Sequence, residues 1–509
     1  MTPLYEQVLR LLQDSPDRPL PLAWKPSPSS PEARPELTDD QLAVLRRWAE
    51  RSRTQAGAVG RRLVREGTAE QAVLVGLELL ARAGTAYDLP LVRTVALYRP
   101  FTARAGAALA ALGGTASDLH WLADRLRPRH RITLIRGLCP SSTPAARRWL
   151  LHQVSAFRRM PGAEVRRVAE AVGLVQLLDD PGSDESTCLD AGRALLAMSR
   201  WDHHRPQIDR YRDAVPAYRA LLRRSERWPP TFDRYALLLE LAQELATGHS
   251  WRLDWSPGEP AGIVDRILAA LDVPRWRRCL ADALTAHPPL TRARAQWAEL
   301  TLARLTYRHP ARPGSARLDL WTVRGDPGWS DLLDACVLVD GVPLPCDRYI
   351  DQGFDFLIAP AGLGPGWAHY GEPGTVCERA DGRVHWREPG GRTVGFDAAE
   401  YDAEVARAQA DDSWAWPALL VADALHRRLS AEPELLTRWG CTLEWVLAEN
   451  DEPGLVRLRF RHDTSPDGPA RHLVLPLPVD DRPPSEQAGA AASWLAANDP
   501  VGRASGAWD

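Results

Sequence analysis

The chain has 509 residues and a formal net charge of −3 at pH 7, and its length predicts two to four units of about 150 residues each. Its seven cysteines are odd in number and form no C-x-x-C pair, which predicts reduced thiols in a cytoplasmic protein. The start of the sequence lacks a secretory pattern, and the most apolar run, residues 72–80, is far shorter than the roughly 18 residues of a membrane span, so we expect no membrane association.

The first segment, residues 1–37, is predicted to be a short amphipathic helix over residues 4–13 and then a proline- and serine-rich connector. Thr38 and Gln41 form a capping-box pattern that begins a long series of helices. The pattern predicts a helical domain over residues 38–310. Its later helices are predicted at residues 161–179, 186–199, 207–225, 230–247, 259–272, 274–286 and 290–306.

One pattern of two helices occurs twice between residues 69 and 138. The first helix of the pattern recurs after thirty positions: Asp88, Leu89, Leu91, Val92 and Ala96 match Asp118, Leu119, Trp121, Leu122 and Leu126. The second helix recurs after twenty-nine positions: Ala103, Ala105, Gly106 and Leu109 match Ile132, Leu134, Ile135 and Leu138. Paired short helices at such a period are typical of an α-solenoid.

These two repeats resemble the HEAT-repeat family of helical hairpins. The resemblance implies a curved stack of helix pairs whose exposed faces bind another macromolecule, usually a protein, and it implies no catalytic residues. The period of 29 to 30 residues is shorter than the roughly 40 to 47 residues of HEAT units. Short linkers or tight helices would explain the shorter period, and so would a different class of helical repeat. Beyond residue 200 the repeat is no longer visible.

After residue 315 the pattern changes to short alternating runs between turn residues, which predicts an α+β domain over residues 316–509 with antiparallel hairpins. Asp340-Gly341 and Asp381-Gly382 are the clearest hairpin turns. Helices are predicted at residues 398–410, 415–430 and 484–497. Strands are predicted at residues 318–323, 335–339, 354–359, 375–379, 384–387, 441–449, 454–461 and 471–477.

Charge is divided unevenly along the chain. Residues 316–509 contain 17 arginines against 32 aspartates and glutamates, a net charge of −15, whereas the rest of the chain carries +12. Such asymmetry can attract partners, and it can also hold the two parts of the chain together.

The densest basic stretch, residues 121–170, contains eleven arginines against three acidic residues. Guanidinium groups on successive helices could follow a phosphate backbone, and N-terminal helix turns could hold an anion. Solvated helix faces, or a surface that contacts the acidic domain, explain the same residues. The candidate anion- or nucleic-acid-binding residues are Arg129, Arg131, Arg147, Arg148, Arg158, Arg159, Arg166 and Arg167.

The glycine-rich segment 351–374 is the best candidate for a pocket, because glycines permit close ligand approach and aromatic side chains can stack on a ligand. A structured loop without chemistry is the alternative. Lys25 is the only lysine, so no phosphate-binding P-loop exists, and no standard spacing of zinc ligands or nucleophile motif occurs. We therefore predict no cofactor, metal or catalytic residue. The candidate pocket residues are Asp351, Asp355, Trp367, His369 and Tyr370.

Arg457, Arg459 and Arg461 alternate with apolar residues, so a strand would present three guanidinium groups on one face. They could form an anion platform, but pairing with carboxylates such as Glu444 across the sheet is the favoured interpretation.

The leading hypothesis is a non-enzymatic interaction protein that binds another protein through its helical surface, for example a bacterial scaffold, a regulatory factor or an immunity-type protein. Nucleic-acid binding through residues 121–170 is the first alternative, and an enzyme with a site in residues 351–374 is the second. The oligomeric state does not follow from the sequence.

Overall fold

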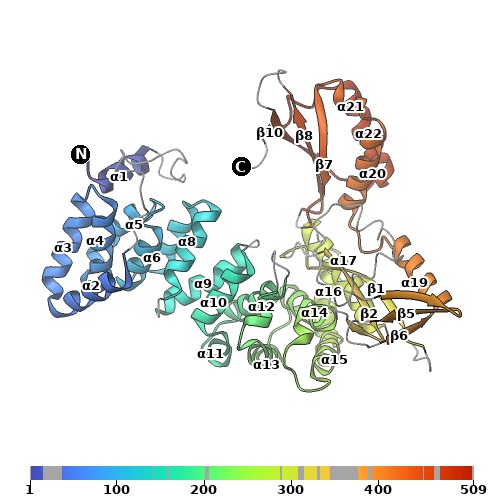
Figure 1. Cartoon of the computed structure of the whole chain (residues 1–509), viewed down its shortest axis with the longest axis horizontal. Coiled ribbons are helices and arrows are strands. Elements are labelled where there is room, and N and C mark those ends of the chain that lie inside the picture. Colours follow the sequence, from blue (N-terminus) through green and yellow to red (C-terminus); the bar gives the residue numbers. More distant parts are fainter. Residues whose placement is uncertain are drawn as a thin grey trace. The chain divides into compact units, whose positions relative to one another are not determined.

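The computed structural model describes residues 2–14, 37–140, 143–157, 160–200, 206–286, 289–307, 315–329, 333–343, 376–387, 393–450, 452–463 and 470–506. The chain divides into two compact units, Met1–Trp228 and Pro229–Asp509. The predicted fold class is confirmed: the N-terminal part is helical, and an α+β part with antiparallel sheets follows it (Figure 1). The unit boundary falls inside the predicted segment 38–310, and the predicted domain limits stay a prediction.

The first unit is built from helices joined by short connections. Most are ten to fifteen residues long and bury one face. The elements are α1 (Leu4–Asp14), α2 (Asp39–Arg51), α3 (Arg53–Glu66), α4 (Glu70–Ala83), η1 (Ala86–Asp88), α5 (Leu89–Ala96), α6 (Thr102–Ala111), α7 (Ala116–Asp124), α8 (Pro128–Leu138), α9 (Pro144–Ala156), α10 (Gly162–Val172), α11 (Leu174–Asp179), α12 (Glu185–Ser199), η2 (Ile208–Arg210) and α13 (Ala214–Ser225).

These helices form two rows. In one row α2, α4, α6, α8, α10 and α12 each contact the next, and in the other row α3, α5, α7 and α9 do the same. Contacts such as α3 with α4 and α5 with α6 join the rows. Helix α1 packs on α3 and α5.

Glycines allow close packing between α6 and α8 and between α3 and α4. A Cβ on Gly137 in α8 would lie 2.3 Å from the backbone oxygen of Ala103 in α6. A Cβ on Gly76 in α4 would lie 2.9 Å from the backbone oxygen of Gly60 in α3. Small residues at these positions therefore let backbones approach more closely than larger side chains would permit.

Local sequence signals set the helix ends. The capping box predicted at Thr38 and Gln41 is confirmed, since each side chain accepts a hydrogen bond from the other residue's backbone N–H. The single helix predicted at residues 161–179 is wrong, because Gly173 adopts a left-handed conformation with φ of 69° and separates α10 from α11.

The second unit begins with helices and continues into the sheets. Polar contacts join these two parts: Trp297 Nε1 and Gln243 Nε2 both donate to the backbone oxygen of Arg324, at 2.6 and 3.0 Å. Its helices are α14 (Phe232–Thr247), η3 (His249–Arg252), α15 (Glu259–Leu271), α16 (Pro274–Leu284), α17 (Pro289–Thr306), α19 (Ala398–Ala410), α20 (Pro417–Ala431), α21 (Glu434–Thr437) and α22 (Pro484–Ala497).

Three antiparallel sheets lie in the second unit, ordered β1-β2-β3, β4-β5-β6 and β10-β9-β8-β7. Both predicted hairpin turns are confirmed, because Asp340-Gly341 and Asp381-Gly382 have positive φ at both positions and join paired strands. The strands are β1 (Leu318–Arg324), β2 (Leu333–Val339), β3 (Val342–Pro343), β4 (Val376–Ala380), β5 (Arg383–Arg387), β6 (Thr393–Asp397), β7 (Cys441–Leu447), β8 (Leu455–His462), β9 (Arg471–Pro478) and β10 (Ser505–Gly506). The strand predicted at residues 354–359 lies outside the described residues.

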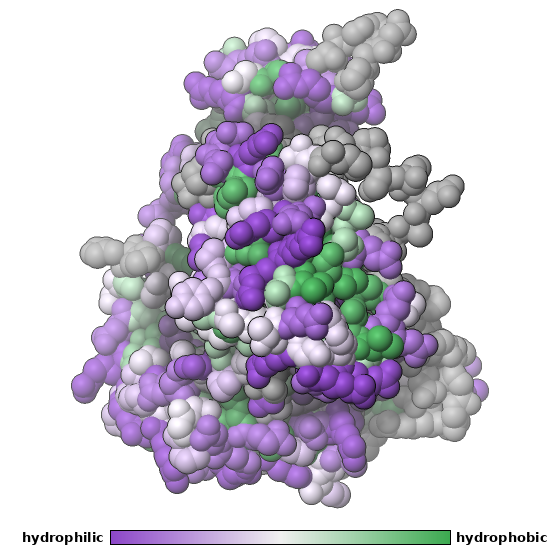
Figure 2. Space-filling model, turned by 90° about the vertical axis from the view of Figure 1, so that its left-hand side faces the viewer, coloured by the Kyte–Doolittle hydropathy of each residue, from purple (hydrophilic) through white to green (hydrophobic). Residues whose placement is uncertain are grey.

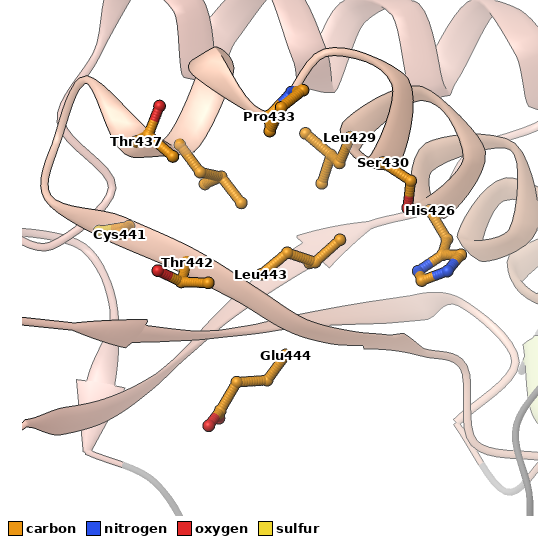
Figure 3. A pocket seen from close by; sticks show the side chains of 10 residues that line it. His426, Leu429, Ser430, Pro433, Thr437, Cys441, Thr442, Leu443 and Glu444 are labelled. Carbon is orange, nitrogen blue, oxygen red and sulfur yellow. The ribbon is translucent and has the colours of Figure 1, made fainter.

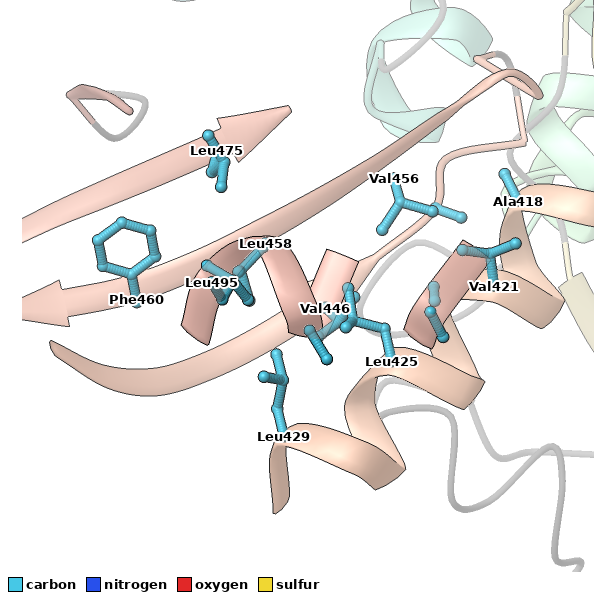
Figure 4. Packing of buried hydrophobic residues seen from close by; sticks show 14 of the residues in the cluster. Ala418, Val421, Leu425, Leu429, Val446, Val456, Leu458, Phe460, Leu475 and Leu495 are labelled. Atoms are coloured by element: carbon cyan, nitrogen blue, oxygen red, sulfur yellow. The ribbon is translucent and has the colours of Figure 1, made fainter. Parts of the chain in front are cut away.

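The four-stranded sheet and helices α20 and α22 share one hydrophobic core. Figure 4 shows Leu425 and Leu429 of α20 and Leu495 of α22 packed against Leu458 and Phe460 of β8. The alternation along β8 buries Val456, Leu458 and Phe460 and leaves the arginines between them on the opposite face. The predicted meander with a covering C-terminal helix is therefore confirmed, and the short strand β10 extends it.

Candidate interaction surfaces

The structure divides the eight predicted anion-binding arginines into several groups. Arg158 and Arg159 lie outside the described residues, and Arg129 lies in α8 without a described side chain. Arg147 and Arg148 are exposed in the first turn of α9. The other three make contacts within the unit, so the predicted residues do not share one environment.

The contacts of these three arginines are mostly local. Arg131 Nε donates to the backbone oxygen of Leu126 at 3.3 Å. Arg166 bonds Glu170 in its own helix at 2.7 Å and donates to the Gln207 amide oxygen at 3.3 Å. Arg167 approaches Glu164 within 3.5 Å.

Glu78 in α4 is the centre of the clearest charged cluster. Its side chain is only 7% exposed, yet it contacts three arginines that are 35 to 45% exposed. Arg46 from α2 donates through Nε at 2.8 Å, Arg104 from α6 lies at 3.3 Å, and Arg82 from α4 lies at 4.0 Å. One buried carboxylate thus orients guanidinium groups from three adjacent helices, and the cluster carries two positive charges in excess.

Glu164 in α10 repeats this arrangement further along the same row of helices. Its side chain is 5% exposed, and it contacts Arg136 from α8 at 2.5 Å and Arg167 at 3.5 Å. The hydrogen bond to Glu164 raises the pKa of Arg136, so this guanidinium stays charged. Both arginines remain about half exposed, and they can contact a partner without losing the carboxylate that holds them.

A second set of contacts joins α3, α5 and α7 at the repeated aspartates. Asp88 accepts a hydrogen bond from the backbone N–H of Thr85 at 2.8 Å and pairs with Arg61 of α3 at 3.0 Å. Thirty positions later, Asp118 accepts from the Thr115 N–H at 2.9 Å and pairs with Arg93 of α5 at 3.2 Å. The aspartates that match in sequence thus make the same two kinds of contact.

Trp121 in α7 contacts two arginines. The guanidinium carbon of Arg93 lies 4.1 Å from the centre of one of its rings and that of Arg125 lies 4.4 Å away. Arg93 also reaches Asp118, so one arginine connects the aromatic ring to the carboxylate that caps α7. Cation–π contacts of this kind stabilise the surface by about 0.5–1 kcal/mol at exposed sites.

A polar group lies where α7, α9 and α12 meet. Asp190 of α12 accepts a hydrogen bond from Ser155 and lies 3.5 Å from His152 Nδ1, and the His152 ring contacts that of His120. Burial raises the pKa of Asp190 above its ordinary value, against the opposing effects of Ser155 and His152. Within the described residues no group of three or more His, Cys, Asp or Glu side chains is arranged to hold a metal ion.

The arginines of β8 are paired with carboxylates. Arg459 Nε donates to Glu444 at 2.7 Å across the sheet, which confirms the predicted pair. Arg457 pairs with Glu449 and Glu452, and Arg461 lies 3.3 Å from Asp463. Each of these three arginines is therefore paired with a carboxylate, and this pairing argues against an anion-binding platform on this face.

All five candidate pocket residues, Asp351, Asp355, Trp367, His369 and Tyr370, lie outside the described residues. The structure instead forms an open groove of about 380 Å³ between α20, α21 and β7, which the sequence did not indicate. His426, Ser430, Thr437, Cys441 and Leu443 are among its lining residues (Figure 3).

Four of the described cysteines, Cys139, Cys188, Cys279 and Cys441, have thiol pKa values raised by burial. Burial raises the pKa of Cys139 and of Cys441 to about 11, and it raises the pKa of Cys188 and Cys279 as well. Little thiolate therefore exists near neutral pH. Cys441, which lines the groove, acts there as a small buried apolar group.

Most of the molecular surface drawn in Figure 2 is hydrophilic. Among the described residues, no helix is both long enough and apolar enough to cross a membrane. No protein-family model matches the chain, and neither a curated protein nor a solved structure gives a significant match.

Proposed function

We propose that the chain is a non-enzymatic interaction protein that binds another protein through the helical surface of its first unit. The observation that supports this proposal is the pair of buried carboxylates, Glu78 and Glu164, that orient arginines from adjacent helices. Arginine is enriched at protein interfaces, and a guanidinium that is already held loses less conformational freedom when a partner binds.

The charge of these clusters favours a partner that presents carboxylates at separate points. Arg46, Arg82 and Arg104 exceed Glu78 by two charges, and Arg136 and Arg167 exceed Glu164 by one. Each cluster also contains a carboxylate close to its guanidinium groups. This carboxylate would repel a continuous phosphate backbone more strongly than it would repel isolated acidic side chains. An acidic protein surface is therefore the partner class that we infer.

We also propose that the first unit is a HEAT-like helical-repeat array. The matched contacts of Asp88 and Asp118 support this, as each is bound by a threonine N–H and by an arginine of an earlier helix. The matched second helices bury corresponding positions, since Leu109 and Leu138 are both fully buried. An array of this kind offers an extended surface built from successive helices.

The experiment compares two double variants of the full chain, purified at low salt from its native host. Arg82→Ala with Arg167→Ala removes two half-exposed guanidinium groups but leaves Arg46 on Glu78 at 2.8 Å and Arg136 on Glu164 at 2.5 Å. Arg62→Ala with Arg223→Ala changes the net charge equally at exposed pairs outside these clusters.

We expect a stoichiometric protein partner to co-purify with the unchanged chain and with the Arg62/Arg223 variant, and to be lost from the Arg82/Arg167 variant. The proposal fails if both variants retain the partner equally, or if both lose it equally, since charge alone would then explain the binding.

Nucleic-acid binding is the second candidate, and the exposed Arg147 and Arg148 in the first turn of α9 favour it. It predicts that nucleic acid co-purifies at low salt and that added salt releases it steeply. Arg147→Glu with Arg148→Glu should then abolish the nucleic-acid absorbance. Binding that ignores salt or this double change would reject the candidate.

A further inference from the structure

Strand β7 is an edge strand of its sheet in the part of the chain that the structure describes. Among the described residues it pairs only with β8, because the strand order of its sheet is β10-β9-β8-β7. An edge strand presents backbone N–H and C=O groups that an additional strand can bind. The register of the β7–β8 pairing shifts between Leu443 and Trp445, so the ladder is irregular at Glu444.

The groove of about 380 Å³ lies beside this edge, between β7 and helices α20 and α21. Buried Leu429, Leu436 and Cys441 give it an apolar floor, whereas Ser430 and Thr437 are exposed at its rim. Figure 3 shows Leu443 directed toward the helices. A backbone edge and an apolar recess thus lie next to each other on one side of the sheet.

Glu444 does not occupy the recess. Its side chain points away from the groove in Figure 3 and bonds Arg459 at 2.7 Å and His472 at 2.8 Å on the opposite face. Among the described residues, Glu444 is the only carboxylate that lines the groove, and it is therefore engaged on the opposite face of the sheet.

We propose that β7 and this groove bind an extended, basic segment of a partner polypeptide by strand addition. The backbone of the segment would pair with the β7 edge, and one apolar side chain would enter the recess above Leu429 and Leu436. In this mode of recognition, backbone hydrogen bonds supply affinity and side-chain pockets supply specificity. The site lies in the second unit and does not depend on the function proposed for the first.

The net charge of this part of the chain indicates which kind of strand would bind at the β7 edge. Residues 316–509, which contain the groove, carry a net charge of −15. A second copy of the chain pairing through β7 would bring two such regions together, which like-charge repulsion opposes. A basic segment gains from the same field, so a heterologous basic peptide is the favoured occupant.

The test measures binding of a fluorescein-labelled peptide, Lys-Val-Lys-Leu-Lys-Val-Lys, to the full chain by fluorescence anisotropy. Two further versions carry N-methyl groups on alternate backbone nitrogens, one version for each edge of the peptide strand. Methylation removes backbone donors and keeps every positive charge. Ser430→Trp and Thr437→Trp fill the rim of the groove, and Ser493→Trp, at an exposed position of α22, is the matched control outside it.

Strand addition predicts that Ser430→Trp, Thr437→Trp and at least one N-methylated peptide each weaken binding by about tenfold or more, whereas Ser493→Trp changes it by less than about twofold. Hydrogen exchange should slow at amides of residues 441–447 when the peptide is bound. The proposal is overturned if no binding occurs at millimolar peptide, if both methylated peptides bind like the parent, or if Ser493→Trp weakens binding as much as the groove variants. Arg82→Ala with Arg167→Ala should leave this binding unchanged.

Discussion

Glu78→Ala tests whether the buried carboxylates hold the arginine clusters in place. The change removes the group that contacts Arg46, Arg82 and Arg104 and leaves three positive charges around an empty site. Breaking a fully buried ion pair costs about 3–5 kcal/mol, but these arginines are 35 to 45% exposed and can turn toward water. We therefore expect a loss of about 2 kcal/mol in the free energy of unfolding of this part of the unit.

The loss should appear as faster hydrogen exchange of α4 and α6 amides, read under conditions where these helices open locally. Glu66→Ala is the matched control, because Glu66 lies on the neighbouring helix α3, is 61% exposed and pairs only with Arg62 four residues away in its own helix. We expect the control to change stability by less than about 0.5 kcal/mol. Equal effects of the two substitutions would refute the role assigned to Glu78.

Three further predictions follow from local geometry. Gly137→Ala should destabilise the first unit by about 1–3 kcal/mol, because the new Cβ would lie 2.3 Å from the Ala103 oxygen. Gly262→Ala in α15 places a Cβ that meets no atom within 4 Å, so it should stabilise the chain by about 0.5–1 kcal/mol. Urea unfolding of both variants checks the opposite signs. Asp184 caps α12, and the hydrogen bond from the Thr187 N–H lowers the pKa of its carboxyl. Asp184→Ala should therefore reduce the free energy of unfolding by about 1 kcal/mol at pH 7. The reduction should become progressively smaller as the pH falls from the unfolded pKa of about 3.9 through the lower folded pKa. A cost that stayed constant as the pH fell through that range would contradict this assignment. Cys441, with its pKa raised from 9.0 to about 11, should react with iodoacetamide at pH 8 about 100-fold more slowly in the folded chain than in urea, and equal rates measured by mass spectrometry would contradict its burial.

Local signals allowed much of the fold to be predicted. The capping box at Thr38 begins α2 where the sequence indicates, and the Asp-Gly pairs at 340 and 381 form turns with positive φ. The break at Gly173 was missed because glycine inside a helical pattern is often tolerated. Strand β10 has only two residues and pairs with β9 across a long connection, so no alternation could indicate it.

The candidate surface was only partly predictable. The sequence shows how many arginines are present, but Glu78 binds Arg46 from 32 positions earlier, and such a distance carries no local signal. One signal did exist, because Glu78 interrupts the apolar run 72–80, and a carboxylate among buried residues usually requires a cation partner. Its partners could not be named without the packing of α2, α4 and α6.

The most direct test of the central claim is arginine-specific modification with phenylglyoxal, read by mass spectrometry on the full chain with and without its co-purified protein partner. Arg82 and Arg167 are half exposed in the clusters around Glu78 and Glu164, whereas Arg62 and Arg223 are exposed outside them. We expect the partner to protect the first two by about fivefold or more and to leave the other two unchanged, as binding through the ordered arginines requires. The account would be contradicted if the partner protected none of the four arginines, or protected all four equally, relative to the free chain.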